Sequence, residues 1–419
     1  MPIGYLLTVL LMAWCTLFAL APPRPRHTSP SNLGYWFGFL INELPFIAIW
    51  WLLASTLLAF GQGDVASPAG WAAFGLAVLT TVGLVVLAWR GLRAGPAVDR
   101  ALDEGLGAGW RTTVDARRRR PWARILFWPF PVRPRQVERV ANIAYGDAGR
   151  WNLLDLYRHR GHPAGGPVLV YLHGGAFRSG GKRREARPLL YRLASHGWVC
   201  ISANYHLGPA ARFPDHLVAV KKVLAWVRDH GREYGADPAV VFVAGSSAGA
   251  HLAATAALTA NDPSFQPGFE PADTSVAAAV CLYGYYGSLD GRAASSPLAY
   301  AQADAPPFLV AHGDKDTIVL VEDARRFVQG LRQSSSNPVV YAELPGRSTC
   351  STCSIPSGSR RWSTRSRPSP PGPGRTGRPG RHRTRIHPVD GASSYSATGP
   401  ADPGRSSRRD GRTAAFEHR

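Results

Sequence analysis

The sequence has few cysteines. Five occur in 419 residues, without the dense, even spacing of a disulfide framework: Cys15, Cys200, Cys281, Cys350 and Cys353. This scarcity excludes a small disulfide-held scaffold, and we expect no structural disulfides. Cys350 and Cys353 form a C-x-x-C, but no second cysteine pair or nearby strand–helix pattern supports a redox or metal site there.

Acidic residues are also scarce, since 28 Asp and Glu stand against 48 Lys and Arg, a net charge of +20. Such an excess ordinarily suggests a nucleic-acid partner. The charge is unevenly distributed, because residues 347–419 contain 15 arginines, no lysine and four acidic residues, and so supply eleven of the twenty charges. A basic nucleic-acid binder would rest on that segment alone, and we expect no nucleic-acid partner.

Residues 347–419 lack leucine altogether and are rich in Arg, Ser, Pro and Gly, which predicts a disordered tail. Back-translated with GC-rich codons and read in another frame, Thr349–Pro368 can spell an amphipathic, helix-forming segment. We therefore hypothesise that the tail is a frameshifted reading of an ordinary C-terminus.

Long apolar runs are confined to the first part of the chain, at Gly4–Ala21, Trp36–Phe60 and Trp71–Trp89. Each approaches or exceeds the roughly 18–20 residues that cross a membrane as a helix. A cleaved signal peptide is the alternative for the first run, and buried core helices are the alternative for all three. The first run has no Lys or Arg before it and two more follow, so we predict a membrane region over residues 1–92 with about three spans.

Short loops indicate the orientation, because Lys and Arg are retained on the cytoplasmic side. Arg24 and Arg26 lie in the first loop, Asp64 is the one charge in the second, and Arg90 and Arg93 follow the third span. We predict that the N-terminus is outside and that the domain after the third span is cytoplasmic.

Two further features of this region have both a functional and an ordinary interpretation. Glu43 stands near one end of the second span. Either it has a functional role there, or its carboxylate reaches the membrane interface or pairs with a neighbouring helix. Residues 93–136 are predicted as a linker in which arginines alternate with Trp and Phe, a composition suited to anionic headgroups or to ordinary positive-inside flanking.

Beyond the linker, short apolar runs alternate with longer amphipathic ones. Five runs are predicted as buried strands: Val168–Leu172, Val199–Ala203, Val240–Ala244, Ala278–Leu282 and Phe308–Ala311. Pro214–His230 and Ala248–Ala260 are predicted as helices between them. This alternation indicates an α/β domain over residues 137–346, with a mostly parallel, doubly wound sheet.

The run Gly245-Ser246-Ser247-Ala248-Gly249 follows a predicted strand and opens a helix, as a nucleophile elbow requires. The glycines permit a sharp turn that raises the Ser247 hydroxyl above the sheet. The N-terminus of the helix directs free N–H groups at an oxyanion formed there. Alone the motif is weak, because small-residue turns after strands are common.

A second motif, His173-Gly174-Gly175-Ala176, ends an earlier strand. Its glycines let backbone N–H groups approach a bound carbonyl, and with the N–H of Ala248 they would form an oxyanion hole. A plain glycine turn is the alternative. Both motifs follow separate strands in the order that catalysis needs, so chance explains them poorly.

A third polar cluster, His312-Gly-Asp-Lys-Asp316, also ends a strand, where a carboxylate can orient an imidazole. We select Asp316 over Asp314 as the acid, and an ordinary polar loop is the alternative. No metal or cofactor is implied by any of the three motifs.

With these motifs the segment from Val137 to Leu344 resembles the bacterial esterases and lipases related to hormone-sensitive lipase, in the α/β-hydrolase superfamily. The run Ala203–Pro209 followed by Phe213-Pro214 is similar to another stretch of that family. The resemblance implies a nucleophile at Ser247, an acid at Asp316 and oxyanion donors at Gly174 and Gly175. The family's third oxyanion glycine is Ala176 here, and its usual Asp before the nucleophile is Ser246.

The general base that this chemistry needs is missing from its expected place. In the family a His follows a Leu-Pro-Gly turn about 30 residues after the acid, and Leu344-Pro345-Gly346 is present, but no His follows until His382. His382, His387 and His418 are formal candidates in the predicted tail. His173 and His251 adjoin the site, at positions where the family uses neither as base.

The sequence therefore predicts a membrane-anchored serine carboxylester hydrolase that acts on an ester or lipid through an acyl-enzyme, and that is impaired by the missing His. The alternative is a catalytically dead, hydrolase-like membrane protein that binds a lipid or a protein partner.

Overall fold

A computed structural model describes residues 3–22, 41–42, 44–113, 126–127 and 132–348. Within them, eight strands form one sheet in the order β1-β2-β4-β3-β5-β6-β7-β8. The strands are β1 (Val137–Ala144), β2 (Leu153–His159), β3 (Gly166–Leu172), β4 (Val199–Ala203), β5 (Ala236–Ser246), β6 (Ala278–Leu282), β7 (Phe308–Gly313) and β8 (Val339–Leu344). The five predicted strands are confirmed as β3 to β7, and β1, β2 and β8 are added to them.

The sheet is antiparallel at one end and parallel elsewhere. β2 pairs antiparallel with both β1 and β4. The strands from β4 through β3, β5, β6 and β7 to β8 pair parallel. The carboxyl ends of the parallel strands therefore meet at one edge, where binding sites of open α/β sheets lie.

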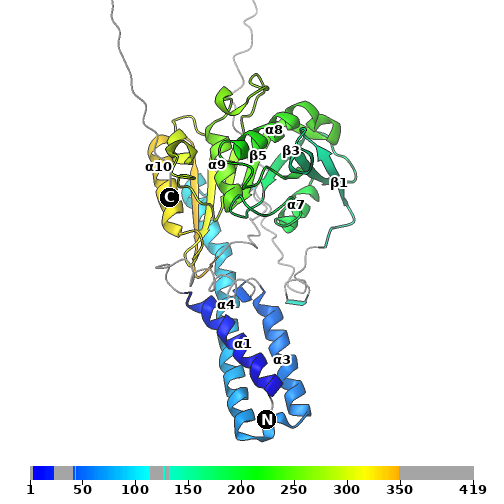
Figure 1. Ribbon diagram of the computed structural model, residues 1–419, viewed down its shortest axis with the longest axis vertical. Coiled ribbons are helices and arrows are strands. Elements are labelled where there is room, and N and C mark those ends of the chain that lie inside the picture. Colours follow the sequence, from blue (N-terminus) through cyan, green and yellow to red (C-terminus); the bar gives the residue numbers. More distant parts are fainter. Residues whose placement is uncertain (1–2, 23–40, 43, 114–125, 128–131, 349–419) are drawn as a thin grey trace, which may run out of the picture. The chain divides into compact units, whose positions relative to one another are not determined.

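Helices cover both faces of the sheet (Figure 1), as the long apolar strands require. On one face α8 (Asp215–His230), α9 (Ala248–Leu258) and α10 (Val321–Ser334) pack on a core that includes Val170, Val243 and Val310. On the other face α7 (Arg187–Ala194) packs on a core that includes Tyr171 and Phe242. The mostly parallel, doubly wound fold of an α/β-hydrolase is thus confirmed.

Within the described residues, three apolar helices precede the sheet: α1 (Ile3–Leu20), α3 (Pro45–Gly61) and α4 (Pro68–Leu106). They pack on one another through a cluster that includes Val9, Leu52 and Leu84. By length and composition α1 and α4 could each cross a membrane, whereas α3, with 17 residues, is a shorter apolar helix. The described residues thus contain two helices that are long enough, rather than the three expected.

Helix α4 continues well past the apolar run Trp71–Trp89 and reaches Leu106 despite Pro96 in its interior. Its second half carries a stripe of small and apolar residues at helical spacing, which packs on β6, β7 and β8 on the face that α7 also covers. The stripe consists of Ala94, Ala97, Val98, Ala101, Leu102 and Leu106. Residues 93–106, expected as part of a linker, are therefore helical. The residues against which this segment packs lie in strands much later in the chain.

The remaining short elements join these parts. They are the helix α5 (Trp110–Thr113) and the 3₁₀ turns η1 (Asp64–Ala66), η2 (Gly149–Asn152), η3 (Gly231–Tyr234), η4 (Pro263–Phe265), η5 (Ala293–Ser295) and η6 (Pro297–Tyr300). Cys15, Cys200 and Cys281 are free thiols in the described part of the chain. The expectations for Glu43, for Cys350 and Cys353 and for the tail after Ser348 fall outside the described residues.

Candidate active site

Ser247 stands on a sharp turn between β5 and α9. Its backbone has φ 51° and ψ −117°, a strained conformation for a residue with a side chain. The glycines on either side make the turn sterically feasible. A Cβ on Gly245 would lie 2.2 Å from the carbonyl oxygen of Gly249, and a Cβ on Gly249 would lie 2.1 Å from that of Leu172.

The turn leaves the Ser247 side chain accessible while its neighbours are buried. Ser247 is half-buried, whereas Ser246 and Ala248 are fully buried. The Ser247 N–H donates to the carbonyl of Leu282 at 2.9 Å, which fixes the turn to the end of β6. Ala248 is the first residue of α9, so its N–H has no partner within the helix and lies at the positive end of the helix dipole.

The glycine-rich loop after β3 lies directly against this turn. A Cβ on Gly174 would be 3.2 Å from the Cβ of Ser247, so the loop backbone and the serine are in contact. Gly175 has φ 125°, and a Cβ there would lie 1.9 Å from the carbonyl oxygen of Ser179. The sequence-predicted oxyanion loop and nucleophile are therefore brought together.

One of the expected oxyanion donors is already engaged. The N–H of Gly174 donates to the Glu185 carboxylate at 3.1 Å, so it is not directed at a substrate oxygen. The N–H groups of Gly175 and Ala176 donate no hydrogen bond to any residue in the described ranges. Among the described residues of the loop, the N–H groups available to a bound oxygen are therefore those of Gly175 and Ala176, because a carboxylate already accepts from the predicted donor Gly174.

The side chain of His173, the first residue of this loop, is packed inside the protein. Its ring is buried, lies 2.7 Å from the Gly174 carbonyl through Nδ1, and stacks on Tyr205 with ring centroids 4.4 Å apart. The Tyr205 hydroxyl donates to the His173 carbonyl at 2.7 Å. Burial lowers the pKa of His173 below its ordinary value, so the ring is neutral at pH 7.

Asp316 lies just beyond the carboxyl end of β7, which is separated from β5 only by β6. Its Oδ1 accepts from the N–H groups of Ile318 and Val319 at 2.9 and 3.0 Å. Its Oδ2 is buried without a hydrogen bond in the described part of the chain. Burial raises the pKa of Asp316 to about 7 against the lowering effect of the two N–H donors.

Asp314 has a different role. Its Oδ1 accepts from the Gly346 N–H at 2.6 Å and so closes the turn that follows β8. Asp316, not Asp314, is the buried carboxylate with an oxygen left over, as expected for the residue that orients a base.

No histidine in the described residues is placed to act as the base between Ser247 and Asp316. His312 comes within 3.7 Å of Asp316, but it is fully buried and its Nε2 lies 2.9 Å from the Val319 carbonyl. His251 is buried on α9, where burial lowers its pKa to about 4. His382, His387 and His418 fall outside the described residues.

Comparison with known proteins identifies the family to which the chain belongs. The chain is 38% identical over 379 residues to a protein of Mycobacterium tuberculosis named "Probable carboxylic ester hydrolase LipM", an alignment that covers 82% of this chain and 87% of LipM. The chain belongs to the α/β-hydrolase esterases related to hormone-sensitive lipase.

Other matches to this esterase cover smaller parts of it. Residues 154–290 match the family model BD-FAE. Esterase LipQ of the same bacterium is 38% identical over 301 residues, which are 63% of this chain and 71% of LipQ. The solved structure of Thermogutta terrifontis esterase 2 phosphoramylated by tabun is 24% identical, covers 53% of this chain and 87% of its own, and has a TM-score of 0.45. The expected carboxylesterase or lipase class of enzyme is confirmed by the relatives.

Sequence reasoning missed Glu185, which links the two motifs of this esterase. Its Oε2 accepts from the Gly174 N–H, the Ser246 hydroxyl and, at 3.4 Å, the Tyr171 hydroxyl. One carboxylate thus fastens the oxyanion loop to the residue before the nucleophile. In the sequence Glu185 stands in a Lys- and Arg-rich run that is typical of solvated surface. The one indication of its role was that Ser246 replaces the family's usual Asp, so that the carboxylate at this place has to come from elsewhere.

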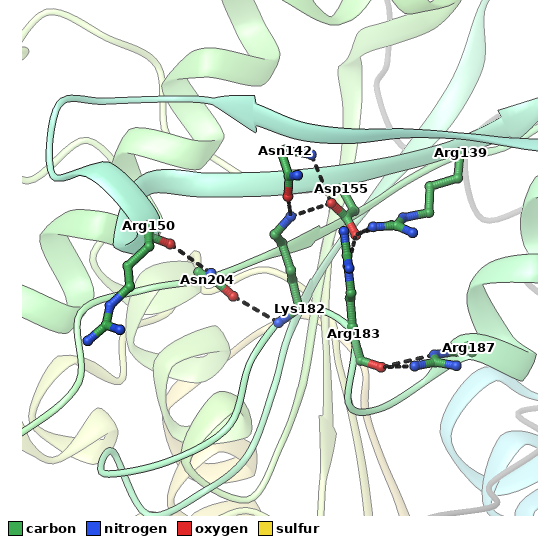
Figure 2. A network of polar contacts seen from close by, with 8 residues as sticks. All are labelled: Arg139, Asn142, Arg150, Asp155, Lys182, Arg183, Arg187 and Asn204. Atoms are coloured by element: carbon green, nitrogen blue, oxygen red, sulfur yellow. Dashed lines mark hydrogen bonds and ion pairs between the residues drawn. The ribbon is translucent and has the colours of Figure 1, made fainter.

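A buried ionic network holds the other end of the same loop (Figure 2). Asp155 on β2 is fully buried and bonds the Lys182 ammonium and the Arg139 guanidinium, while Lys182 also donates to the Asn142 side chain at 2.5 Å. Although burial raises the pKa of Asp155, the Lys182 ammonium and other donors lower it overall, so the carboxylate is ionised. The Lys182 N–H donates to Asn204 at 2.9 Å, which joins the loop to the end of β4.

Proposed function

We propose that this esterase is a membrane-anchored serine carboxylester hydrolase that acts through an acyl-enzyme on Ser247. The observation that carries the proposal is the elbow itself. Ser247 is held at positive φ between two glycines that tolerate no Cβ, and it touches a loop with unengaged N–H groups. Backbone strain of this kind persists where the surrounding structure enforces it, and it is concentrated at catalytic turns.

The proposed reaction has two steps. In the first, Ser247 Oγ bonds to the carbonyl carbon of the ester, its proton passes to a base, and the alcohol leaves with a proton. In the second, water attacks the acyl-enzyme and releases the acid and free Ser247. The N–H groups of Gly175, Ala176 and Ala248 stabilise the oxyanion in both steps. Asp316 Oδ2 is the acceptor for the imidazole N–H of the base.

The base is the element that this chain does not supply among its described residues. We therefore expect the chain as written to hydrolyse short acyl esters poorly or not at all, because loss of the base removes most catalysis by a triad. The second candidate function, a hydrolase-like membrane protein without activity that binds a lipid or partner, is favoured by this one observation.

An assay of p-nitrophenyl butyrate hydrolysis in detergent, with and without added imidazole, tests the proposal. We expect turnover near background alone and an imidazole-dependent rise that disappears in Ser247→Ala. Rapid turnover without imidazole that Ser247→Ala abolishes would mean that another residue serves as base. Absence of any Ser247-dependent rise would favour the inactive protein. Resequencing the gene across the codons for Asp316 to Arg419 decides whether a base follows Gly346 in the true frame.

The membrane anchor is part of the proposal. Many large apolar side chains of α1, α3 and α4 face outward, including Leu17, Leu57 and Leu79, which are 61%, 63% and 69% exposed. Apolar surface of this extent is unusual in water and suits the hydrocarbon core of a bilayer. We propose three spans within residues 1–92, a cytoplasmic catalytic domain over residues 137–346, and a separate tail over residues 347–419.

A further inference from the structure

The direction of α4 against the sheet follows from its contacts at two ends of β8. A Cβ on Gly105 would lie 2.7 Å from Val340 Cγ2, near the start of β8. A Cβ on Gly346, just after β8, would lie 2.7 Å from Arg90 Cδ. The helix therefore runs antiparallel to the strand. The two stretches also match in length, about 22 Å for fifteen helical steps and about 20 Å for six extended ones.

This direction determines which edge of the sheet lies near the apolar part of α4. The parallel strands end at the edge that holds the oxyanion loop, Ser247 and Asp316. Since β8 is parallel to β7 and ends at Leu344, the turn after β8 lies at that same edge. Arg90 contacts this turn, so the active-site edge is the one nearest the end of the span Trp71–Trp89.

Several contacts gather the inner ends of the apolar helices at this turn. The Arg90 guanidinium donates to the carbonyl of Leu20, the last residue of α1, at 3.1 Å. The Arg347 guanidinium donates to the carbonyl of Asn42 at 3.1 Å, and the Asn42 side chain donates to the Ser348 hydroxyl at 2.8 Å. Arginines and polar side chains at helix ends mark the level at which a membrane helix meets water.

The same turn is bonded to the loop that carries the catalytic acid. The Lys315 N–H donates to the Arg347 carbonyl at 2.9 Å, and the Gly346 N–H donates to Asp314. The ends of the apolar helices and Asp316 are thus connected through hydrogen bonds and a few residues of backbone.

Side chains at this level have the character of a membrane interface. Arg93 lies over the Trp89 ring, 3.5 Å from its centroid, and Trp50 stacks on Phe127 with centroids 5.5 Å apart. In the acid loop Ile318 and Leu320 are 44% and 38% exposed, although both are aliphatic. Aromatic rings with cationic neighbours are enriched at headgroup level, and exposed aliphatic side chains favour contact with lipid.

We propose that α4 holds the active-site edge of the sheet at the membrane–water interface, and that the substrate is an acyl ester embedded in the bilayer rather than dissolved in water. This inference rests on the proposed hydrolase function for its chemistry and on the α4 contacts for its geometry. The ester group of an amphiphile lies at headgroup level, which is the level at which Arg90 and the acid loop lie.

The placement of the site is tested in proteoliposomes without any need for activity. Ile318→Cys, labelled with an environment-sensitive fluorophore, is compared with Gln333→Cys. Gln333 is exposed near the end of α10, shortly before β8 begins, and so lies at the opposite edge of the sheet. Cys15, Cys350 and Cys353 are replaced by serine, and the fluorescence is quenched with nitroxide-headgroup lipids. We expect at least threefold stronger quenching at position 318. Equal quenching at the two positions overturns the proposal.

The substrate class is tested with a variant that weakens docking of α4 on the sheet. The starting chain carries Thr349→His, which supplies an imidazole three residues after Gly346, the spacing of the family's base. In this chain Gly105→Leu places a side chain against Val340, whereas Gly109→Leu is the matched control because nothing lies within 4 Å of a Cβ there. We expect Gly105→Leu to lower hydrolysis of a fluorogenic diacylglycerol in vesicles at least fivefold and to leave hydrolysis of a soluble butyrate ester unchanged.

An equal fall for both esters in Gly105→Leu would contradict delivery from the bilayer, since it would indicate simple loss of fold. Hydrolysis of neither ester by the control would instead contradict the proposed hydrolase function, and the quenching experiment would still decide where the acid loop lies.

Discussion

The nucleophile side of the active site, built on β3 and β5, differs from the acid side, built on β7 and β8, in how its polar groups are satisfied. On the nucleophile side, Glu185 accepts from Gly174 and Ser246, and Tyr205 donates to the loop carbonyl of His173. On the acid side, Asp316 Oδ2 and His312 Nδ1 have no hydrogen-bond partner among the described residues.

The difference shows that the polar groups of the two sides are satisfied by different means. The nucleophile side is determined by backbone geometry that a few glycines impose, and by one carboxylate, Glu185, that lies 61 residues before Ser246. On the acid side Asp316 Oδ2 has no hydrogen-bond donor among the described residues, and burial raises the pKa of this carboxyl to about 7. The turn that presents Ser247 can therefore be complete while the hydrogen bonding of Asp316 is not.

The largest expected effect comes from supplying an imidazole to the acid side. In the family the base stands three residues after the glycine of the Leu-Pro-Gly turn, which is position 349 here. Thr349→His is expected to raise kcat/KM for p-nitrophenyl butyrate ~100-fold or more, the usual contribution of a general base. Thr349→Ala is the matched control, and an equal change in both variants would show that the acid side cannot be completed from this position.

The next effect, on stability rather than on rate, is expected from breaking the nucleophile side. Gly249→Ala brings a Cβ to 2.1 Å from the Leu172 carbonyl oxygen, so the strand or the helix must move. We expect the free energy of unfolding, measured by chemical denaturation in detergent, to fall by ~3 kcal/mol or more. Gly181→Ala, whose nearest neighbour is 3.6 Å away, should change it by less than ~1 kcal/mol. Equal stability of the two variants would rule out this steric account of the elbow.

The pH dependence of stability tests the acid side. The pKa of Asp316 is about 7 in the folded chain and near 4 when unfolded, so the folded chain binds the proton more tightly. This contribution is complete below pH ~4 and is lost as the pH rises to 7, a change of a few kcal/mol at most. Asp316→Asn should therefore show a smaller fall in Tm between pH 5 and pH 8 than the parent chain. Asp314→Asn is the control and should keep the parent slope; an unchanged slope in Asp316→Asn would contradict the assignment.

The smallest effect is expected at Glu185, which positions the oxyanion loop without touching substrate. In a chain with a base at position 349, Glu185→Ala should lower kcat about tenfold with little change in KM, since only stabilisation of the transition state is affected. Glu185→Gln, which keeps one acceptor for the Gly174 N–H, should recover part of the loss. Arg184→Ala, an exposed neighbour, should leave both constants unchanged. A change in KM alone would indicate a role in substrate binding instead.

The sequence was most informative where the required geometry is local. Ser247 and the loop at Gly175 follow from short motifs at strand ends, and the strands β3 to β7 follow from apolar runs. β1, β2 and β8 were not predicted. The edge strand β1 is partly exposed and lacks such a run, and Asp155 interrupts the apolar residues of the buried strand β2.

The missed features depend on residues that are distant in the chain. The segment that includes Ala97 and Ala101 was predicted as a linker, because small residues carry little hydrophobic signal. Its packing on Val340 is seen only in the folded chain. Glu185 reads as surface charge until the fold brings it to Ser246. The engagement of the Gly174 N–H could not have been inferred from the motif alone.

The unbroken course of α4 also bears on how the protein is made. During synthesis α4 leaves the ribosome long before β8, so the last strand of the sheet docks on a helix that has already been made. The helix thus serves as a template for the catalytic domain. A chain shortened to begin at Val137 would expose the apolar face around Val340 and Ala342, and we expect it to aggregate rather than to fold as a soluble enzyme.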